Sequence, residues 1–178
     1  NKLAILDSIK YTTAAEFVEV GARYALGNYN LGGLGLAMLL DSDDYRIANG
    51  YMIRLYNDIA LYPIVNGKVV KEDPISYAQP SALPSYGDTL SVVYRNNPKL
   101  NSFEVKINGN SIGMVQDYQK RFGTSGVLYS GVILYGALFN EVDSYSIKIP
   151  HLEPERMVAF GTTSISGEVD KTLSSALS

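Results

Sequence analysis

The sequence predicts an all-β domain, an antiparallel β-sandwich of two sheets. Three observations support this fold: short apolar runs that alternate with polar residues, frequent Gly and Pro between them, and Asn-Gly pairs that join β-branched runs. The chain has 178 residues with 16 Gly, 7 Pro and 14 Tyr, but no Trp. Tyrosine favours strands because its ring packs on a pleated surface while its hydroxyl reaches water.

About ten strands are expected before residue 150, and no helix. Residues 17–26 alternate, with one side apolar and the other charged; the apolar side carries Val18, Val20, Ala22 and Tyr24. Residues 34–40 are almost wholly apolar, which is typical of a strand covered on both faces. Asn49-Gly50 predicts a tight turn before a strand over 51–56.

Two hairpins are predicted from Asn-Gly pairs, since both residues tolerate the positive φ of a type I′ turn. They are residues 61–71 around Asn66-Gly67 and residues 103–116 around Asn108-Gly109. In the second hairpin Phe, Val and Ile of 103–107 are expected to point inward.

Strands are also expected over 89–95, 127–135 and 143–149. The Pro-containing stretch 72–88 predicts a long loop, which would cover one sheet, carry a ligand site or pack on a neighbouring domain.

The expected domain spans residues 1–150, with 151–178 as a linker or the start of a following element. Within that tail, 157–161 could add a strand, and 168–178 could form a frayed helix or the start of a following element. Because the sequence begins at Asn1 and ends in a polar stretch, we expect a piece of a longer protein.

Charge and cysteine content exclude several classes of function. The net charge is −3, and the Lys and Arg residues are scattered singly, whereas a nucleic-acid-binding protein would carry a basic stripe. No run approaches the ~20 apolar residues of a membrane helix. The absence of Cys excludes disulfides and cysteine-ligated zinc.

The order of the segments resembles the concanavalin A-like lectin/glucanase superfamily, which includes laminin-G-like and other carbohydrate-binding jelly-roll modules. The resemblance covers residues 15–150 and implies a concanavalin A-like jelly roll. It is carried by GLGLAMLL (33–40) with NGYMIRLY (49–56) and ALYPIVNGKVV (60–70), by DTLSVVYRNN (88–97) with FEVKINGNSIGMV (103–115), and by SGVLYSGVILYGALFNEVDSYSIKI (125–149).

The resemblance implies carbohydrate binding, to which tyrosines are suited. A sugar stacks its apolar C–H face on an aromatic ring while its hydroxyls bind polar neighbours. The expected contacts are Tyr51, Arg54, Tyr56, Tyr77, Tyr86 and Tyr94. Arg54 has the opposite parity to Tyr51 and is therefore expected on the other side of the sheet. Core packing is the alternative role for each tyrosine.

Glucanases of this superfamily carry three acidic residues at alternate positions of one strand, where two carboxylates act as acid and nucleophile. The nearest positions here are Glu141, Asp143 and Tyr145, so the third carboxylate is missing and a non-catalytic module is expected. The single histidine, His151, lies in the expected linker, which disfavours a Ser–His mechanism.

An acidic loop forms a candidate calcium site. Asp41, Asp43 and Asp44 supply hard oxygens, and Ca²⁺ takes six to eight oxygen ligands. Related modules often hold calcium, so the resemblance favours this ion, while a solvated acidic turn is the alternative. No other cofactor is expected.

The leading hypothesis is a non-catalytic carbohydrate-binding or adhesive module of a larger surface or attachment protein, located outside the cell, on its surface or on a virion. Its partner would be a glycan. The alternative is a structural or decoration domain of a virion, tail or cell-surface assembly, with neighbouring domains or subunits as partners. A third hypothesis is a glycan-active hydrolase or lyase.

Overall fold

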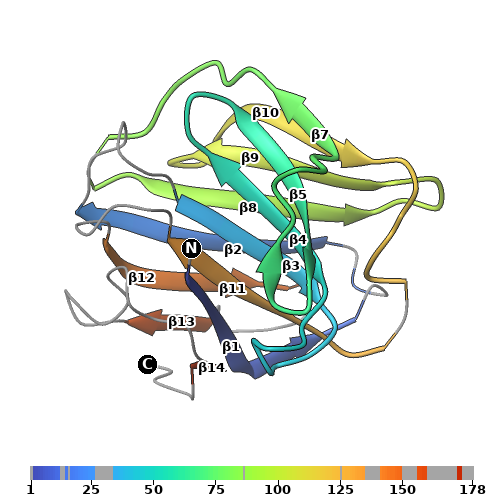
Figure 1. The fold of residues 1–178 in the computed structure, drawn as a ribbon. Coiled ribbons are helices and arrows are strands. Elements are labelled where there is room, and N and C mark those ends of the chain that lie inside the picture. The colour runs from blue at the N-terminus through green and yellow to red at the C-terminus, as the bar shows by residue number, and fades with distance from the viewer. Residues whose placement is uncertain are drawn as a thin grey trace.

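The computed structural model confirms the all-β sandwich of two sheets. Figure 1 shows one sheet lying over the other. The structure describes residues 2–12, 15, 17–26, 34–85, 87–124, 126–134, 141–149, 156–159 and 172–173.

Sheet A has eight strands and sheet B has six. Across sheet A the order is β14 (Thr172–Leu173), β1 (Lys2–Tyr11), β11 (Leu128–Leu134), β3 (Leu34–Leu40), β4 (Gly50–Leu55), β5 (Ile59–Val65) and β6 (Lys68–Val69), and β7 (Ser76–Ala78) also pairs with β5. Across sheet B the order is β10 (Asn110–Asp117), β9 (Asn101–Ile107), β8 (Thr89–Asn96), β2 (Phe17–Leu26), β12 (Glu141–Lys148) and β13 (Arg156–Ala159).

The chain crosses between the two sheets several times, and between crossings most consecutive strands pair with each other. It passes from β1 in sheet A to β2 in sheet B, returns for β3 to β7, and crosses again for β8 to β10. It then places β11 in sheet A and β12 in sheet B. Neighbouring strands are antiparallel except for the parallel pair β1 and β14. This strand order confirms the predicted jelly-roll sandwich.

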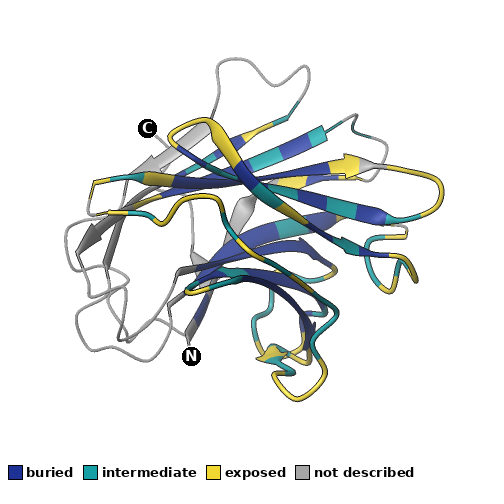
Figure 2. Cartoon of the chain, turned by 90° about the horizontal axis from the view of Figure 1, so that it is seen from above, coloured by how far each residue is buried: buried dark blue, intermediate teal, exposed yellow. Residues whose placement is uncertain are grey.

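The main core lies between the sheets and follows the period-two pattern. In β9, Phe103, Val105 and Ile107 are buried, as predicted, while Glu104 and Lys106 point outward. In β2 the buried residues Val18, Val20 and Ala22 confirm the predicted apolar side. Figure 2 shows buried positions along the strands of both sheets and exposed positions mainly in the loops and at strand ends.

Sheet A is also buried on much of its outer face, which explains the continuous apolar run in β3. Leu36 and Met38 belong to the core between the sheets, whereas Ala37 and Leu40 belong to a second cluster. That outer cluster consists of Leu3, Ile5, Ala37, Leu40, Ala48, Met52, Ala60, Tyr62, Ile64 and Ile133. The prediction that residues 34–40 are covered on both faces is therefore confirmed for the described side chains.

Both predicted Asn-Gly hairpins are present. Asn66 and Gly67 have φ of 49° and 74°, and Asn108 and Gly109 have φ of 50° and 82°, as type I′ turns require. The tight turn predicted at Asn49-Gly50 is wrong, because neither residue has positive φ and Gly50 begins β4.

The glycine at position 50 is explained by close packing of the backbone and not by a turn. A Cβ there would lie 2.8 Å from the carbonyl oxygen of Leu39 and 2.9 Å from that of Met38. A close approach of the neighbouring backbone, rather than a turn, therefore explains this glycine.

The predicted loop 72–88 contains a short strand and links the edges of the two sheets. Its strand β7 pairs with β5 of sheet A, and the Ser81 N–H donates to the carbonyl of Ile112 in β10 of sheet B (3.0 Å). The Gln116 N–H of β10 also donates to the Ser76 hydroxyl of β7 (3.5 Å). The segment therefore closes one side of the sandwich.

Two parts of the chain differ from the prediction. Strand β1 was not expected, and its pairing with β11 shifts register between Leu6 and Tyr11, where the simple alternation is interrupted. The tail 151–178 was expected to be a linker or a following element, but its described pieces are edge strands: β13 pairs with β12 and β14 pairs with β1. The strand expected over 157–161 overlaps β13. Of residues 168–178, expected as a frayed helix or the start of a following element, the structure describes Thr172–Leu173, which form β14.

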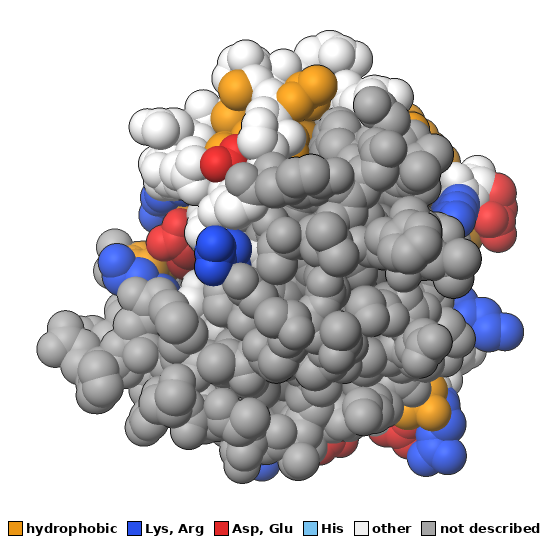
Figure 3. All heavy atoms as spheres, turned by 90° about the vertical axis from the view of Figure 1, so that its left-hand side faces the viewer, with side chains coloured by type: hydrophobic (Ala, Val, Ile, Leu, Met, Phe, Trp, Pro, Cys, Tyr) orange, Lys and Arg blue, Asp and Glu red, His pale blue; other side chains and the backbone are white. Residues whose placement is uncertain are grey.

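Charges on the surface are mixed. In Figure 3 the basic side chains of the described residues lie apart from one another, several of them near acidic ones. On the outer face of sheet B, ion pairs join Lys106 to Glu19 (3.6 Å) and Arg95 to Glu104 (3.8 Å). The part of the chain that the structure describes includes no helix that could cross a membrane.

Candidate functional site

Strand β4 directs its side chains to two different environments. Tyr51 points into the core between the sheets, whereas Arg54 lies on the outer face and is partly exposed. The predicted opposite orientation of these two residues is therefore confirmed, and it divides the predicted tyrosines into two groups.

The outer group forms a compact patch where β4, β5 and β7 meet. It contains three predicted residues, Arg54, Tyr56 and Tyr77, together with Asp58 and Tyr62. We name these five residues the outer tyrosine patch. These strands lie side by side in Figure 1.

Sheet register places these side chains together. Ala60 of β5 pairs with Arg54 of β4 on one side and with Tyr77 of β7 on the other. The small side chain of Ala60 thus separates two long ones in a single cross-strand row on the outer face. Tyr62 follows two residues after Ala60, so period-two geometry puts it on the same face.

Arg54 is the centre of the patch. Its Nη2 lies 2.6 Å from Oδ1 of Asp58, and its guanidinium lies 5.3 Å from the ring centroid of Tyr62 and 5.9 Å from that of Tyr56. The turn between β4 and β5 holds Asp58 in place, since the Tyr56 N–H donates to its carbonyl (3.0 Å). Ion pairing and cation–π contacts therefore fix the guanidinium from several sides.

Tyr77 presents an aromatic ring to solvent beside this pair. Its side chain belongs to a residue that is 55% exposed, and its ring meets that of Tyr62 edge to face at 6.3 Å. Burial, followed by a hydrogen bond to the Tyr77 hydroxyl, raises the pKa of Tyr62, while the positive charge of Arg54 lowers it. Tyr62 is thus a neutral, nearly buried support for the exposed ring.

The inner group corrects two of the predicted contacts. Tyr51 and Tyr94 are fully buried between the sheets and pack on Phe103, with ring centroids at 5.1 Å and 5.6 Å. A buried ring has no face on which a sugar can stack, so these tyrosines take the alternative role of core packing. Burial also raises the pKa of both phenols.

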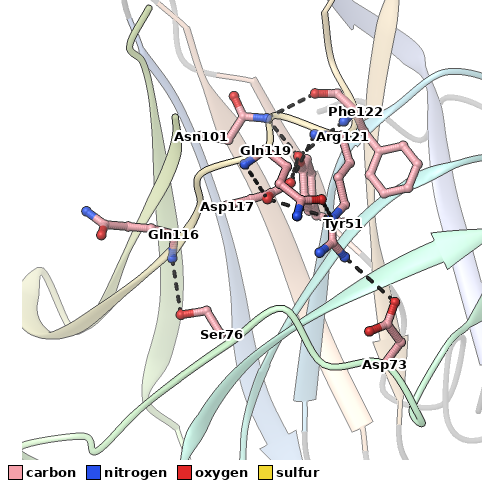
Figure 4. A network of polar contacts seen from close by, with 9 residues as sticks. All are labelled: Tyr51, Asp73, Ser76, Asn101, Gln116, Asp117, Gln119, Arg121 and Phe122. Atoms are coloured by element: carbon pink, nitrogen blue, oxygen red, sulfur yellow. Dashed lines mark hydrogen bonds and ion pairs between the residues drawn. The ribbon is translucent and has the colours of Figure 1, made fainter. Parts of the chain in front are cut away.

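A polar network surrounds Tyr51 (Figure 4). Its hydroxyl donates to Oδ2 of Asp117 (2.7 Å) and accepts from Nδ2 of Asn101 (2.8 Å) and the N–H of Phe122 (3.2 Å). The Tyr94 hydroxyl donates to Oδ1 of Asn101 (3.3 Å). We name Tyr51, Tyr94, Asn101, Asp117 and Phe122 the inner tyrosine cluster.

Asp117 is a buried carboxylate whose oxygens are held by several donors. Besides Tyr51, the N–H of Gln119 donates to Oδ1 (3.0 Å) and the N–H of Arg121 donates to Oδ2 (3.0 Å). The Arg121 guanidinium lies 3.8 Å from Oδ1 and bridges to Asp73 on the surface. The inner cluster therefore fastens the segment after β10 to β4 and β9, which is a structural role.

In the acidic loop, the carboxylates of Asp41 and Asp44 accept hydrogen bonds from neighbouring residues. Both carboxylate oxygens of Asp41 accept hydrogen bonds from Asn49, and both oxygens of Asp44 accept from the Arg46 guanidinium. The hydrogen bonds from Arg46 lower the pKa of Asp44. Asp43 is the third residue of the predicted calcium site. Among the described residues, no three acidic or histidine side chains lie close enough together to hold a metal ion. Binding of Ca²⁺ by this loop stays a prediction.

The glucanase-like positions lie on β12 of sheet B. The backbone of Glu141 and Asp143 belongs to this strand, and their side chains lie outside the described part. Tyr145, at the third position, is buried between the sheets and its hydroxyl donates to that of Ser130 (2.6 Å). Tyr86 and His151 also lie outside the described residues.

The sequence prediction missed Asp58 and Tyr62 as members of the patch. Tyr62 was visible as a strand tyrosine, but its neighbours depend on the register of β4 and β5. The signal that could have identified them is a turn at 56–58. Such a turn pairs Ala60 with Arg54 and thereby brings Asp58 and Tyr62 close to Arg54. Tyr77 was predicted without its strand, because three residues are too few to show a periodic pattern.

Comparisons with known proteins give structural likeness alone. No family model and no curated protein matches the chain. Carbohydrate-binding module CBM66 from Bacillus subtilis superposes with a TM-score of 0.47 at 14% identity, covering 77% of each chain. Sheep galectin-11 gives 0.48 at 11% identity, covering 83% of this chain and 98% of the galectin.

A peptidase has a similar likeness. Scytalido-glutamic peptidase superposes with a TM-score of 0.44 at 8% identity, covering 90% of this chain and 80% of the peptidase. Lectin-like modules and an enzyme thus lie at comparable distances, and such likenesses carry no argument about function.

Proposed function

We propose that the chain is a non-catalytic carbohydrate-binding module and that the outer tyrosine patch is its sugar-binding surface. The observation that carries the proposal is the exposed ring of Tyr77 beside the Arg54–Asp58 ion pair. The aromatic ring suits the apolar face of a sugar, and the ion pair suits its hydroxyls.

The patch combines the two kinds of group that such a ligand requires. A guanidinium donates hydrogen bonds and a carboxylate accepts them, while a sugar hydroxyl does both. Because Arg54 and Tyr77 stand in register on two strands that both pair with β5, their separation is set by the sheet rather than by a loop. A preorganised surface loses less entropy when it binds.

The buried Tyr145 supports a non-catalytic role. At the third position of the glucanase-like pattern it packs in the core, where it could not supply a proton to a glycosidic bond. We extend the proposal to the setting that the sequence suggests, an extracellular, cell-surface or virion protein that uses this module for attachment.

The test is glycan binding by the purified chain, first on a glycan array and then by calorimetry. Tyr77→Ala is expected to weaken binding about tenfold or more, which corresponds to about 1.4 kcal/mol. Tyr118→Ala is the matched control, because Tyr118 is 72% exposed and lies beyond the end of β10 in the other sheet.

Binding that is unchanged in Tyr77→Ala but lost in Tyr118→Ala would move the site to sheet B. Failure of the wild-type chain to bind any glycan would overturn the proposed function and favour a structural domain.

A further inference from the structure

We propose that Met114 is a modification site, at which peroxide oxidises the thioether to a sulfoxide while the sandwich stays folded. Met114 lies on β10, the edge strand of sheet B, and its side chain is on the outer face. The site is separate from the outer tyrosine patch, which belongs to sheet A. Its basis is an exposed sulfur atom that already accepts hydrogen bonds from two polar side chains.

Exposure distinguishes Met114 from the buried methionines of the chain, which has four methionines in all. Met114 is 46% exposed, whereas Met38 and Met52 are fully buried. The side chain of Met157 lies outside the described part. A buried thioether meets an oxidant only when the structure around it opens, and opening of a packed core is rare. Met114 can react without any such opening.

Two donors on the outer face of sheet B contact the sulfur of Met114. The Ser102 hydroxyl donates to Sδ (3.0 Å), and Nε2 of Gln116 donates to it more weakly (3.5 Å). Sheet register brings these residues together, because Gln116 pairs with Ser102 and Met114 pairs with Glu104 further along β9. The Tyr118 hydroxyl donates to Oε1 of Gln116 (2.8 Å) and so holds the amide with Nε2 towards Met114.

The side chain of Gln116 takes no part in the inner tyrosine cluster. In Figure 4 it points away from Tyr51 and Asp117, while its backbone N–H faces Ser76. The amide therefore serves the outer face, on the opposite side of sheet B from the core.

The step transfers one oxygen atom and two electrons. A lone pair of Sδ attacks one oxygen of hydrogen peroxide, so that an S–O bond forms and the O–O bond breaks. The proton on the transferred oxygen passes to the departing oxygen, which leaves as water. Sulfur is oxidised, peroxide is reduced, and the product is methionine sulfoxide.

The surroundings of Met114 suit the product as well as the thioether. A sulfoxide oxygen is a stronger hydrogen-bond acceptor than a thioether sulfur, and the donors on Ser102 and Gln116 already point to this position. The same product at Met38 or Met52 would place a polar group among apolar side chains. We therefore expect oxidation of Met114 to leave the fold intact and to be reversed by methionine sulfoxide reductases.

The test treats the folded chain with hydrogen peroxide at neutral pH and follows each methionine by mass spectrometry. Cleavage after Lys and Arg places the four methionines in separate peptides, which are residues 24–46, 47–54, 107–120 and 157–171. Peptide 107–120 should gain one oxygen atom at least about tenfold faster than peptides 24–46 and 47–54. In concentrated urea, where no core protects Met38 and Met52, the three rates should converge.

Two variants test the assignment and the role of the donors. Met114→Leu, which conserves side-chain volume, should abolish oxygen uptake by peptide 107–120 and leave the other rates unchanged. Ser102→Ala should still be oxidised at Met114. Oxidation should lower its urea midpoint more than it lowers that of the wild type, because the sulfoxide has lost one donor.

The rate comparison is made within the wild-type chain, so it does not depend on the folding of any variant. Oxidation of Met114 no faster than that of Met38 and Met52 in the folded chain would overturn the inference. Loss of the β-sheet circular dichroism in step with oxidation of Met114 would also overturn it. Return of peptide 107–120 to its original mass after reductase treatment of the folded chain would support it.

Discussion

Sheet A uses tyrosine on both of its faces, with opposite results. On the inner face, Tyr51 hydrogen-bonds to a buried carboxylate and its ring packs edge to face on Phe122 at 5.1 Å. On the outer face, Tyr77 stands beside a partly exposed carboxylate–guanidinium pair and keeps an open ring. The comparison shows that parity along a strand, rather than residue type, decides whether an aromatic–carboxylate arrangement stabilises the fold or is available to a ligand.

The largest expected effect is on the inner face. Tyr51→Ala removes a fully buried ring and one hydrogen-bond partner from each of Asp117 and Asn101, so the free energy of unfolding should fall by about 3–5 kcal/mol. Tyr77→Ala, the same change on the outer face, should alter it by less than about 0.5 kcal/mol. Urea unfolding monitored by tyrosine fluorescence measures both, and equal losses would contradict the division into two faces.

The next prediction tests how tightly the outer face is covered away from the patch. At Gly67 a Cβ would lie 1.7 Å from the carbonyl oxygen of Tyr45, which belongs to the loop over the outer cluster. Gly67→Ala should therefore cost about 2–4 kcal/mol, from backbone strain and overpacking together.

Gly109→Ala is the matched control in the other Asn-Gly hairpin. Gly109 has a similar φ of 82°, and nothing lies within 4 Å of its added Cβ. This variant should lose only about 1–2 kcal/mol, the cost of a left-handed alanine. Thermal or urea unfolding of the two variants compares them directly, and a loss no larger in Gly67→Ala would argue against close packing of the Tyr45 loop.

A smaller difference is expected between the two carboxylates that define the faces. Asp117→Asn removes the charge from a buried, multiply hydrogen-bonded group and should cost about 1.5–3 kcal/mol. Asp58→Asn weakens a partly exposed ion pair and should cost at most about 1 kcal/mol. Chemical denaturation of both variants at neutral pH provides the measurement, and a reversed order would show that the outer ion pair contributes more to stability than the buried carboxylate.

The smallest expected effect is the pH dependence of the stability that an exposed carboxylate, Asp88, contributes. Hydrogen bonds from the Ser85 N–H and the Asn108 side-chain amide lower the pKa of Asp88. Its stabilisation is therefore present above the ordinary pKa of aspartate, about 3.9, and is lost as the pH falls through the lower folded value. The difference in stability between wild type and Asp88→Asn should shrink as pH falls from about 5 to about 2. A difference that grows in acid would have the wrong sign.

The sequence predicted those elements in which local pattern and tertiary environment agree. Strand β9 has one buried and one solvent-facing side, so its alternation indicated both its structure and its inward residues. The Asn-Gly hairpins were predictable because positive φ is a local requirement. Asn49-Gly50 has the same two residues, but the glycine at position 50 is explained by the close approach of the backbone of a neighbouring strand. The local sequence does not show that contact.

The site was only partly predictable for a related reason. Almost every residue of β4 is buried, so its sequence does not show which face is open. Of the predicted sugar contacts, Arg54, Tyr56 and Tyr77 lie together on the outer face, and their binding of a sugar stays a prediction. Tyr51 and Tyr94 were included because a tyrosine carries no indication of its own orientation. Asp58 and Tyr62 lie near Arg54 because β4 pairs with β5 in a particular register. The periodicity of a single strand does not predict that register.

The segment that joins the two sheets also bears on self-association. Long, flat strand edges attract strands from other molecules and so promote aggregation. At the side where β7 and β6 border sheet A, these strands contain three and two residues, and Pro74 and Pro80 flank β7. Proline offers no N–H to an incoming strand. Along this border, the described part of the chain therefore offers few backbone groups with which a strand of another copy could pair. This holds although the exposed ring of Tyr77 lies beside the border.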